Sequence, residues 1–131
     1  MAKMASTYSL FLKPNSNLKV LEKIDWYKLY NSVEEAKSKL PENGKRRVVA
    51  SGRPICIVRT KTGFYAVDDA CPHLGESLSK GTVNYLDEIV CPWHSYRYHL
   101  QNGEECKGRG AKLVTHRLEM REDGVFLGVN L

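Results

Sequence analysis

The sequence predicts an all-β fold, a small antiparallel β-sandwich or barrel with one short helix. From residue 46 onward, most apolar residues fall in short segments rich in β-branched and aromatic side chains. Turn signals such as Ser51-Gly52 and Lys61-Thr62-Gly63 separate these segments, and regular spacing of roughly 8–12 residues between short strands is typical of sandwiches and barrels. A chain of 131 residues is expected to form one domain.

The first part of the chain carries the helix signal. Residues 1–24 show no clear period, so we expect either an added edge strand or a loose arm, and residues 14–17 form a turn cluster. The aromatic run at 25–30 predicts a short strand. Ser32 and Glu35 have the spacing of a capping box, which predicts a helix over residues 33–40.

Short strands then fill the remaining chain. The predicted strands cover residues 46–50, 54–60, 64–67, 81–83, 88–90, 96–100, 113–120 and 125–129. Gln101-Asn102-Gly103 is a hairpin signal directly after the sixth of them.

Charge and composition exclude several classes of protein. The net charge of +5 lies in residues 1–50, which hold ten Lys/Arg and five Asp/Glu. This excess is suited to docking with an acidic partner, but no arginine-rich helix or basic aromatic strip points to nucleic acid. We find no apolar run of about 18 residues, as a membrane span requires, and no signal peptide. A cytoplasmic location is therefore expected, and free thiols at Cys56 and Cys106 fit a reducing compartment.

Two short loops hold candidate metal ligands. Cys71-Pro72-His73 has Cys-x-His spacing, Cys91-Pro92-Trp93-His94 has Cys-x-x-His spacing, and seventeen residues separate His73 from Cys91. Thiolate and imidazole bind iron and zinc. One tetrahedral zinc is one interpretation, although structural zinc loops usually separate paired cysteines by two to four residues. The other is a pair of sulfide-bridged irons, with Cys71 and Cys91 on one iron and His73 and His94 on the second.

The pattern resembles that of the Rieske [2Fe–2S] proteins. Their signature matches Cys71-Pro72-His73-Leu74-Gly75 and Cys91-Pro92-Trp93-His94, and the resemblance extends over roughly residues 45–129. It implies one [2Fe–2S] cluster per chain with Cys71, His73, Cys91 and His94 as ligands. It also implies a β-sandwich base from residues 25–68 and 104–131, an inserted cluster-binding subdomain at 69–103, and an N-terminal extension at 1–24.

The resemblance also implies roles for residues around the ligands. The residues expected to surround the cluster are Leu74, Gly75, Trp93, Ser95 and Tyr98. Leu74 and Trp93 are expected to shield it from water, and Tyr98 matches a tyrosine whose hydroxyl bonds a cluster cysteine in high-potential members. Glu76 and Trp93 replace the disulfide cysteines of those members, which favours the lower-potential, ferredoxin-like branch. The loop at 108–111 lacks the proline that high-potential members carry there.

These implications favour a one-electron carrier, not an enzyme, that passes electrons from a reductase to an oxygenase or related enzyme. The chain has no flavin or nicotinamide fingerprint and no set of residues for a second, mononuclear iron, so no catalytic residue is expected. One alternative is a small Rieske subunit of a larger redox enzyme, such as a nitrite-reductase-like assembly, with residues 1–50 as the interface. A zinc-stabilised binding module is another.

Overall fold

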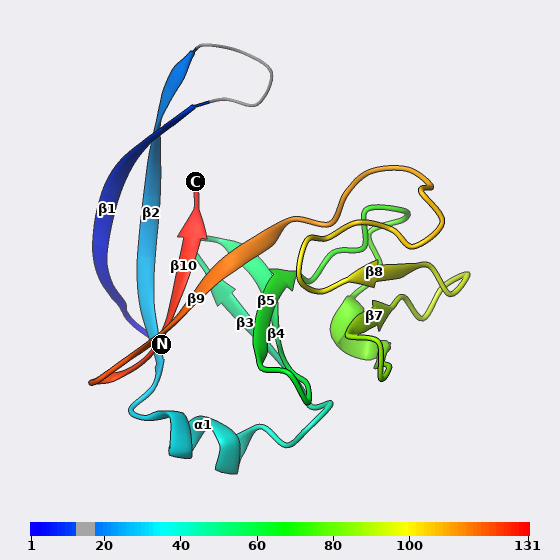
Figure 1. Cartoon of the computed structure of the whole chain (residues 1–131), viewed down its shortest axis with the longest axis horizontal. Helices are drawn as coiled ribbons and strands as arrows, with labels where there is room; N and C mark the ends of the chain where they lie inside the picture. Colours follow the sequence, from blue (N-terminus) through cyan, green and yellow to red (C-terminus); the bar gives the residue numbers. More distant parts are fainter. Residues whose placement is uncertain (13–17) are drawn as a thin grey trace.

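The computed structural model describes residues 1–12 and 18–131, so the turn cluster expected at 14–17 lies outside the described residues. Within them, seven strands form one antiparallel sheet in the order β1-β2-β10-β9-β5-β4-β3 (Figure 1). These strands are β1 (Lys3–Leu12), β2 (Lys19–Tyr30), β3 (Lys45–Ala50), β4 (Arg53–Arg59), β5 (Phe64–Asp68), β9 (Thr115–Arg121) and β10 (Gly124–Asn130). The prediction of an antiparallel all-β fold is confirmed.

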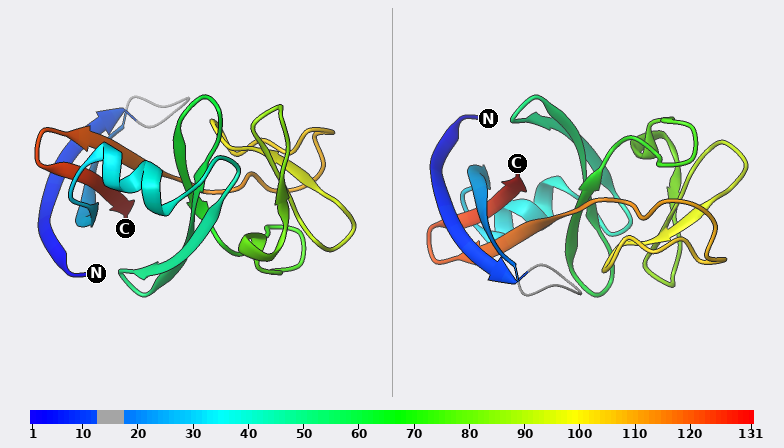
Figure 2. Two further views of the ribbon diagram at one scale, coloured as in Figure 1. Left: turned by 90° about the horizontal axis from the view of Figure 1, so that it is seen from below. Right: turned by 90° about the horizontal axis from the view of Figure 1, so that it is seen from above.

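A second, three-stranded sheet has the order β6-β7-β8. Its strands are β6 (Thr82–Val83), β7 (Glu88–Val90) and β8 (Arg97–His99), and the 3₁₀ turn η1 (Leu78–Lys80) precedes them. Figure 2 shows this sheet and its long loops at one end of the molecule, with β1 and β2 at the other. The domain boundaries given above remain predictions.

The larger sheet folds over on itself so that its two halves enclose one core. Strand β9 pairs with β10 on one side and with β5 on the other. Apolar side chains of β2 and β10 thereby pack against those of β3, β4 and β5, among them Leu29, Leu127, Val48, Ile55 and Ala66. Burying these apolar surfaces against each other supplies the main stabilising contribution of the base.

The predicted helix is present as α1 (Val33–Lys39), one residue shorter than expected because Leu40 is its C-cap. The hydroxyl of Ser32 accepts a hydrogen bond from the Glu35 amide at 3.0 Å, which satisfies one of the free N–H groups of the first turn. The Glu35 carboxylate accepts instead from the Asn31 side chain, at 3.1 Å.

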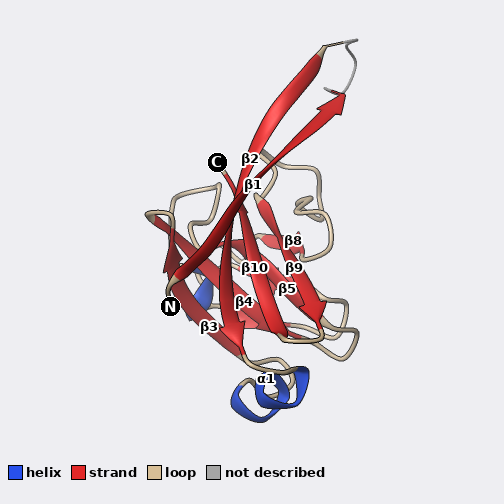
Figure 3. Ribbon diagram, turned by 90° about the vertical axis from the view of Figure 1, so that its left-hand side faces the viewer, coloured by secondary structure: helices blue, strands red, loops and turns tan. Residues whose placement is uncertain are grey.

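The N-terminal residues form an edge strand and not a loose arm. β2 begins at Lys19, six residues before the predicted start, and pairs with β1 in a long hairpin that projects beyond the base (Figure 3). Thr7 accepts a hydrogen bond from the indole of Trp26 at 2.9 Å, and Ser6 donates one to Asp25 at 2.7 Å. The described side chains of β1 are nearly all exposed, so only a weak alternation of apolar and polar residues marked this strand in the sequence.

The hairpin turn predicted at residues 101–103 is present: the Gly103 amide donates to the His99 carbonyl at 2.7 Å, and the His99 amide donates to the Glu104 carbonyl at 2.9 Å. β8 pairs with β7, and on its other side a single bridge joins Tyr98 to Glu105. Gly103 has a φ of 78°, and a Cβ at this position would lie 1.9 Å from the Leu113 carbonyl oxygen. After this turn the chain bridges to β8 at Glu105, and the Leu113 amide later donates to the Gly103 carbonyl at 2.8 Å.

Candidate metal centre

The first ligand loop is a tight turn held by its own backbone. The Gly75 amide donates to the Cys71 carbonyl at 2.7 Å, and the Cys71 amide donates to the Glu76 carbonyl at 2.9 Å. Gly75 has a φ of 78°, a conformation that glycine adopts without steric cost. These bonds turn the chain so that Cys71 and His73 project from neighbouring positions of one turn.

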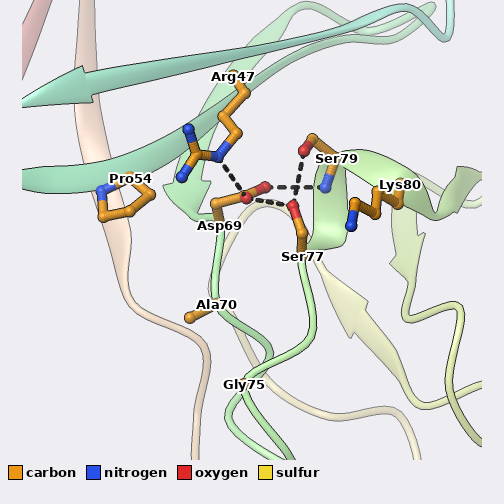
Figure 4. A pocket seen from close by; sticks show the side chains of 8 residues that line it. All are labelled: Arg47, Pro54, Asp69, Ala70, Gly75, Ser77, Ser79 and Lys80. Carbon is orange, nitrogen blue, oxygen red and sulfur yellow. Dashed lines mark hydrogen bonds and ion pairs between the residues drawn. The ribbon is translucent and has the colours of Figure 1, made fainter.

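Buried Asp69 fixes the base of this loop (Figure 4). Its carboxylate accepts hydrogen bonds from the Ser79 amide at 2.8 Å and from Arg47 at 3.1 Å, and a further bond from the Ser77 hydroxyl. The bonds connect β3, the start of the loop and η1 at one carboxylate. Sequence reasoning missed Asp69, because an aspartate before a turn carries no signal of a buried network.

The second ligand loop repeats this construction between β7 and β8. The Cys91 amide donates to the Tyr96 carbonyl at 2.8 Å. His94 and Ser95 have φ angles of 60° and 54°, which lie in the left-handed region that non-glycine residues seldom adopt. The loop thus holds two strained residues, a condition often found at binding sites.

The two loops bring two thiols and two imidazoles together. Cys71 and Cys91 are buried, with 2% and 1% of their surface exposed. The rings of His73 and His94 have centroids 5.4 Å apart and an interplanar angle of 75°, and His94 is exposed. The thiols therefore lie inside, the His73 imidazole is half-buried and the His94 imidazole lies at the surface.

Two further observations indicate that these side chains suit a metal cluster. His73 Nδ1 is buried without a hydrogen-bond partner among the described residues, whereas buried polar atoms are nearly always paired. Burial raises the pKa of the Cys91 thiol, and hydrogen bonding with Cys71 raises it further, against a backbone bond from Trp93 that lowers it. An imidazole nitrogen without a partner and two adjoining buried thiols form a donor set that a metal would satisfy.

Tyr98 points at one of these thiols. Its side chain is buried, and its hydroxyl lies 3.5 Å from the Cys71 sulfur. Burial and this contact both raise the pKa of the tyrosine, so its hydroxyl keeps its proton and can donate it to the sulfur. The geometry is the one expected of a tyrosine that bonds a cluster cysteine.

Two stacked side chains, Tyr96 and Arg109, cover His73. The ring of Tyr96 lies parallel to the His73 imidazole, at 3.9 Å and 6°, and the Arg109 guanidinium lies 3.8 Å from the centre of the Tyr96 ring. Glu105 accepts two hydrogen bonds from the Arg109 side chain, at 3.0 and 3.2 Å. Bonding to Arg109, opposed by burial, lowers the pKa of Glu105 to about 2. The loop at 108–111 thus covers the site with an arginine in place of a proline, a residue that sequence reasoning did not select.

Leu74 and Trp93 lie at the outer rim of the site. They expose 55% and 54% of their surface, respectively, and the Trp93 ring lies 6.4 Å from the His94 ring. Their apolar surface therefore borders the imidazoles and also faces outward, which makes this end of the molecule a suitable contact surface.

Comparisons with known proteins agree with this geometry. The family model of the Rieske [2Fe-2S] domain matches residues 26–117. Ferredoxin CarAc of Metapseudomonas resinovorans is 36% identical over 63% of this chain and 78% of its own length. Cholesterol 7-desaturase nvd 1 of Ciona intestinalis is 31% identical over 56% of this chain, which covers only 15% of the desaturase.

A solved structure shares the fold. It is the complex of reduced oxygenase and oxidized ferredoxin in carbazole 1,9a-dioxygenase, of which one chain superimposes with a TM-score of 0.66 and 29% identity. The match covers 78% of the present chain and 91% of that chain. In the part of the chain that the structure describes, no helix is long and apolar enough to cross a membrane.

Proposed function

Because the chain belongs to the Rieske [2Fe–2S] domain family, we propose that it is a one-electron carrier that delivers electrons to an oxygenase or a related enzyme. The observation that carries the proposal is the donor set of two buried thiols and two outer imidazoles, with His73 Nδ1 unpaired among the described residues. Membership of this family replaces the interpretation of these four residues as a zinc site.

Each donor has a defined place in this proposal. Cys71 and Cys91 would hold one iron of the cluster, and His73 and His94 would hold the other. When bound, the cluster accepts and releases one electron, in the roughly −150 to +300 mV range of centres with two histidine ligands. Because His94 is exposed, we place the closest approach of a partner protein at this residue. Leu74 and Trp93 form the apolar rim that meets this partner.

The proposed partners are a reductase as donor and an oxygenase as acceptor. One relative that this chain covers over most of its length is a ferredoxin, and a similar solved chain belongs to a complex of an oxygenase with a ferredoxin. Because the relative covered over most of its length is a ferredoxin, we propose that the present chain carries electrons and is not itself the catalytic component. We place it in the cytoplasm, since Cys56 and Cys106 are free thiols.

One observation favours a second candidate, a small subunit of a larger redox enzyme. The β1–β2 hairpin begins before the part of the chain that matches the family model. Met4, Tyr8, Leu10 and Leu21 on this hairpin are at least 59% exposed, an unusual concentration of apolar surface. If the chain is such a subunit, it co-purifies with a large partner, and deletion of residues 1–12 releases it.

The test combines spectroscopy with a matched pair of cysteine variants. The wild-type protein, reduced with dithionite, is expected to show the electron paramagnetic resonance signal of a histidine-ligated [2Fe–2S] centre and to contain two irons. Cys71→Ala should lose both, whereas Cys56→Ala, which removes an equally buried thiol, should keep both. A colourless wild-type protein with one zinc and no iron would contradict the proposal.

A further inference from the structure

A second group of metal-binding side chains lies outside the site described above. Glu88 on β7, His99 on β8 and Cys106 in the following loop each offer one ligand atom, and these atoms lie within 4.8 Å of one another. The Cys106 thiol donates to Glu88 Oε2 at 2.7 Å, and His99 Nδ1 lies 3.7 Å from the same oxygen. We propose that these three residues form a Zn²⁺ site, separate from the [2Fe–2S] centre and independent of the proposed electron transfer.

The chemistry of the three donors suits zinc. Zinc binds thiolate sulfur, imidazole nitrogen and carboxylate oxygen, and sites with three protein ligands take water as the fourth. With zinc–ligand distances of about 2.0–2.3 Å, tetrahedral ligand atoms lie about 3.3–3.6 Å apart. The separation of His99 from Glu88 is close to this value. The distance between Cys106 Sγ and Glu88 Oε2 is 2.7 Å. It must increase by less than about 1 Å when the proton between these atoms leaves.

Glu88 is already held in place for such a role. Only 3% of it is exposed, and its other oxygen, Oε1, accepts from the Asn84 side chain at 2.8 Å and from Arg97 at 3.4 Å. Hydrogen bonds that fix the orientation of a ligand are a regular feature of metal sites. The oxygen that faces Cys106 and His99 therefore points in a set direction and does not need to be ordered when zinc binds.

The carboxylates near Cys106 favour a cation, whereas the Arg97 guanidinium, 3.4 Å from Glu88 Oε1, opposes one. Burial and the neighbouring Glu88 carboxylate raise the pKa of the Cys106 thiol to about 11. The negative charge that disfavours the thiolate attracts Zn²⁺, and a coordinated thiol loses its proton. Zinc binding therefore displaces the proton of the Cys106 thiol. The proton is released to solvent, and the thiolate sulfur binds the metal.

The site is accessible and connects three segments. His99 lines a surface cavity of about 230 Å³ and has 43% of its side chain exposed, so its imidazole is open to solvent. Zinc would cross-link β7, β8 and the loop after Gly103, the same loop that places Arg109 over Tyr96. The expected consequence is a higher midpoint of thermal unfolding for the iron-loaded protein.

The test is metal counting on protein that carries two irons per chain. After equilibrium dialysis against micromolar Zn²⁺, we expect one zinc in addition to two irons and an unchanged visible spectrum. Cys106→Ser and His99→Asn should each weaken zinc binding by about tenfold or more. Glu119→Gln removes an exposed carboxylate on β9 and should leave binding unchanged, which controls for general electrostatic attraction.

Three results would overturn the site: no zinc uptake, uptake accompanied by loss of iron, or equal uptake by wild type and both variants. The unchanged cluster spectrum reports whether each variant is folded. If a variant does not fold, zinc X-ray absorption of the wild type decides the matter. One sulfur at about 2.3 Å with lighter ligands at about 2.0–2.2 Å supports the site, and the absence of sulfur rejects it.

Discussion

The Tyr98 hydroxyl lies 3.5 Å from the Cys71 sulfur in a region where both side chains are buried. Tyr98→Phe removes this donor and keeps the ring. A donor stabilises the more negative, reduced state, so we expect the reduction potential to fall. A net hydrogen-bond contribution of about 0.5–1.5 kcal/mol corresponds to roughly 20–60 mV for one electron. Protein-film voltammetry measures the shift.

Tyr27→Phe is the matched control, because the Tyr27 hydroxyl bonds Ser51 at 2.7 Å in the base. It should leave the potential unchanged. Equal shifts in the two variants, or no shift in Tyr98→Phe, would show that the hydroxyl does not act on the cluster.

Ser95→Gly should stabilise the second ligand loop. Ser95 has a φ of 54°, which costs an L-residue about 1 kcal/mol and glycine almost nothing. We expect a gain in unfolding free energy of up to about 1 kcal/mol, measured by denaturant titration of the iron-loaded protein. Ser38→Gly, within α1, should instead destabilise by about 0.5 kcal/mol. A loss of stability in Ser95→Gly would mean that its hydroxyl has a role that outweighs backbone strain.

Arg109→Ala should shorten the lifetime of the cluster. The substitution removes the guanidinium from the Tyr96 ring and both bonds to Glu105. A stacked cation contributes about 0.5–2 kcal/mol, so we expect iron release to a chelator to accelerate roughly twofold to thirtyfold, followed by the decay of visible absorbance.

Arg121→Ala removes a comparable stack in the base, where the guanidinium lies 4.6 Å from the Trp26 ring and 4.5 Å from the Phe126 ring. It should lower global stability but leave the rate of iron release in native conditions near that of wild type. If both variants release iron equally fast, the Arg109 cover has no local effect.

Asp25 should make the base sensitive to acid. Its hydrogen bond from Ser6, opposed by burial and aided by Lys3 and Ser51, lowers its pKa from 3.8 to about 2. Because the folded-state pKa is the lower one, the stabilisation is present above pH 3.8 and is lost as the pH falls toward 2. Asp25→Asn should therefore be less stable than wild type at pH 7, and the difference should shrink by pH 2.

Urea titrations of both proteins at a series of pH values measure this difference. Taking the difference cancels the titration of every group that the two proteins share. A difference that stays constant from pH 7 to pH 2 would contradict the assignment of the stabilisation to the Asp25 carboxylate.

Local signals explain which parts of the fold could be predicted. The helix followed from the spacing of Ser32 and Glu35, because capping depends on residues three apart in the chain. Most base strands followed from runs of β-branched residues. The four donors could be chosen because each pair lies within a few residues, although their role as ligands remains a prediction.

Contacts between distant residues explain what could not be predicted. β1 has exposed side chains and depends on its register against β2, which joins Ser6 to Asp25. Arg109 reaches Tyr96 across thirteen positions of the chain, and Asp69 reaches Arg47 across 22. No pattern of composition or period marks such pairs, since they form only when the chain is folded.

The described chain ends have a practical consequence for joining this protein to other molecules. Both termini lie at the base, away from the loops that carry Leu74 and Trp93 (Figures 1 and 2). A fusion partner, an affinity tag or an electrode linker attached at either terminus would leave the redox-active end uncovered. Attachment and electron exchange thus take place at two different ends of the fold. A molecule immobilised through a terminus would present His73 and His94 to the solution.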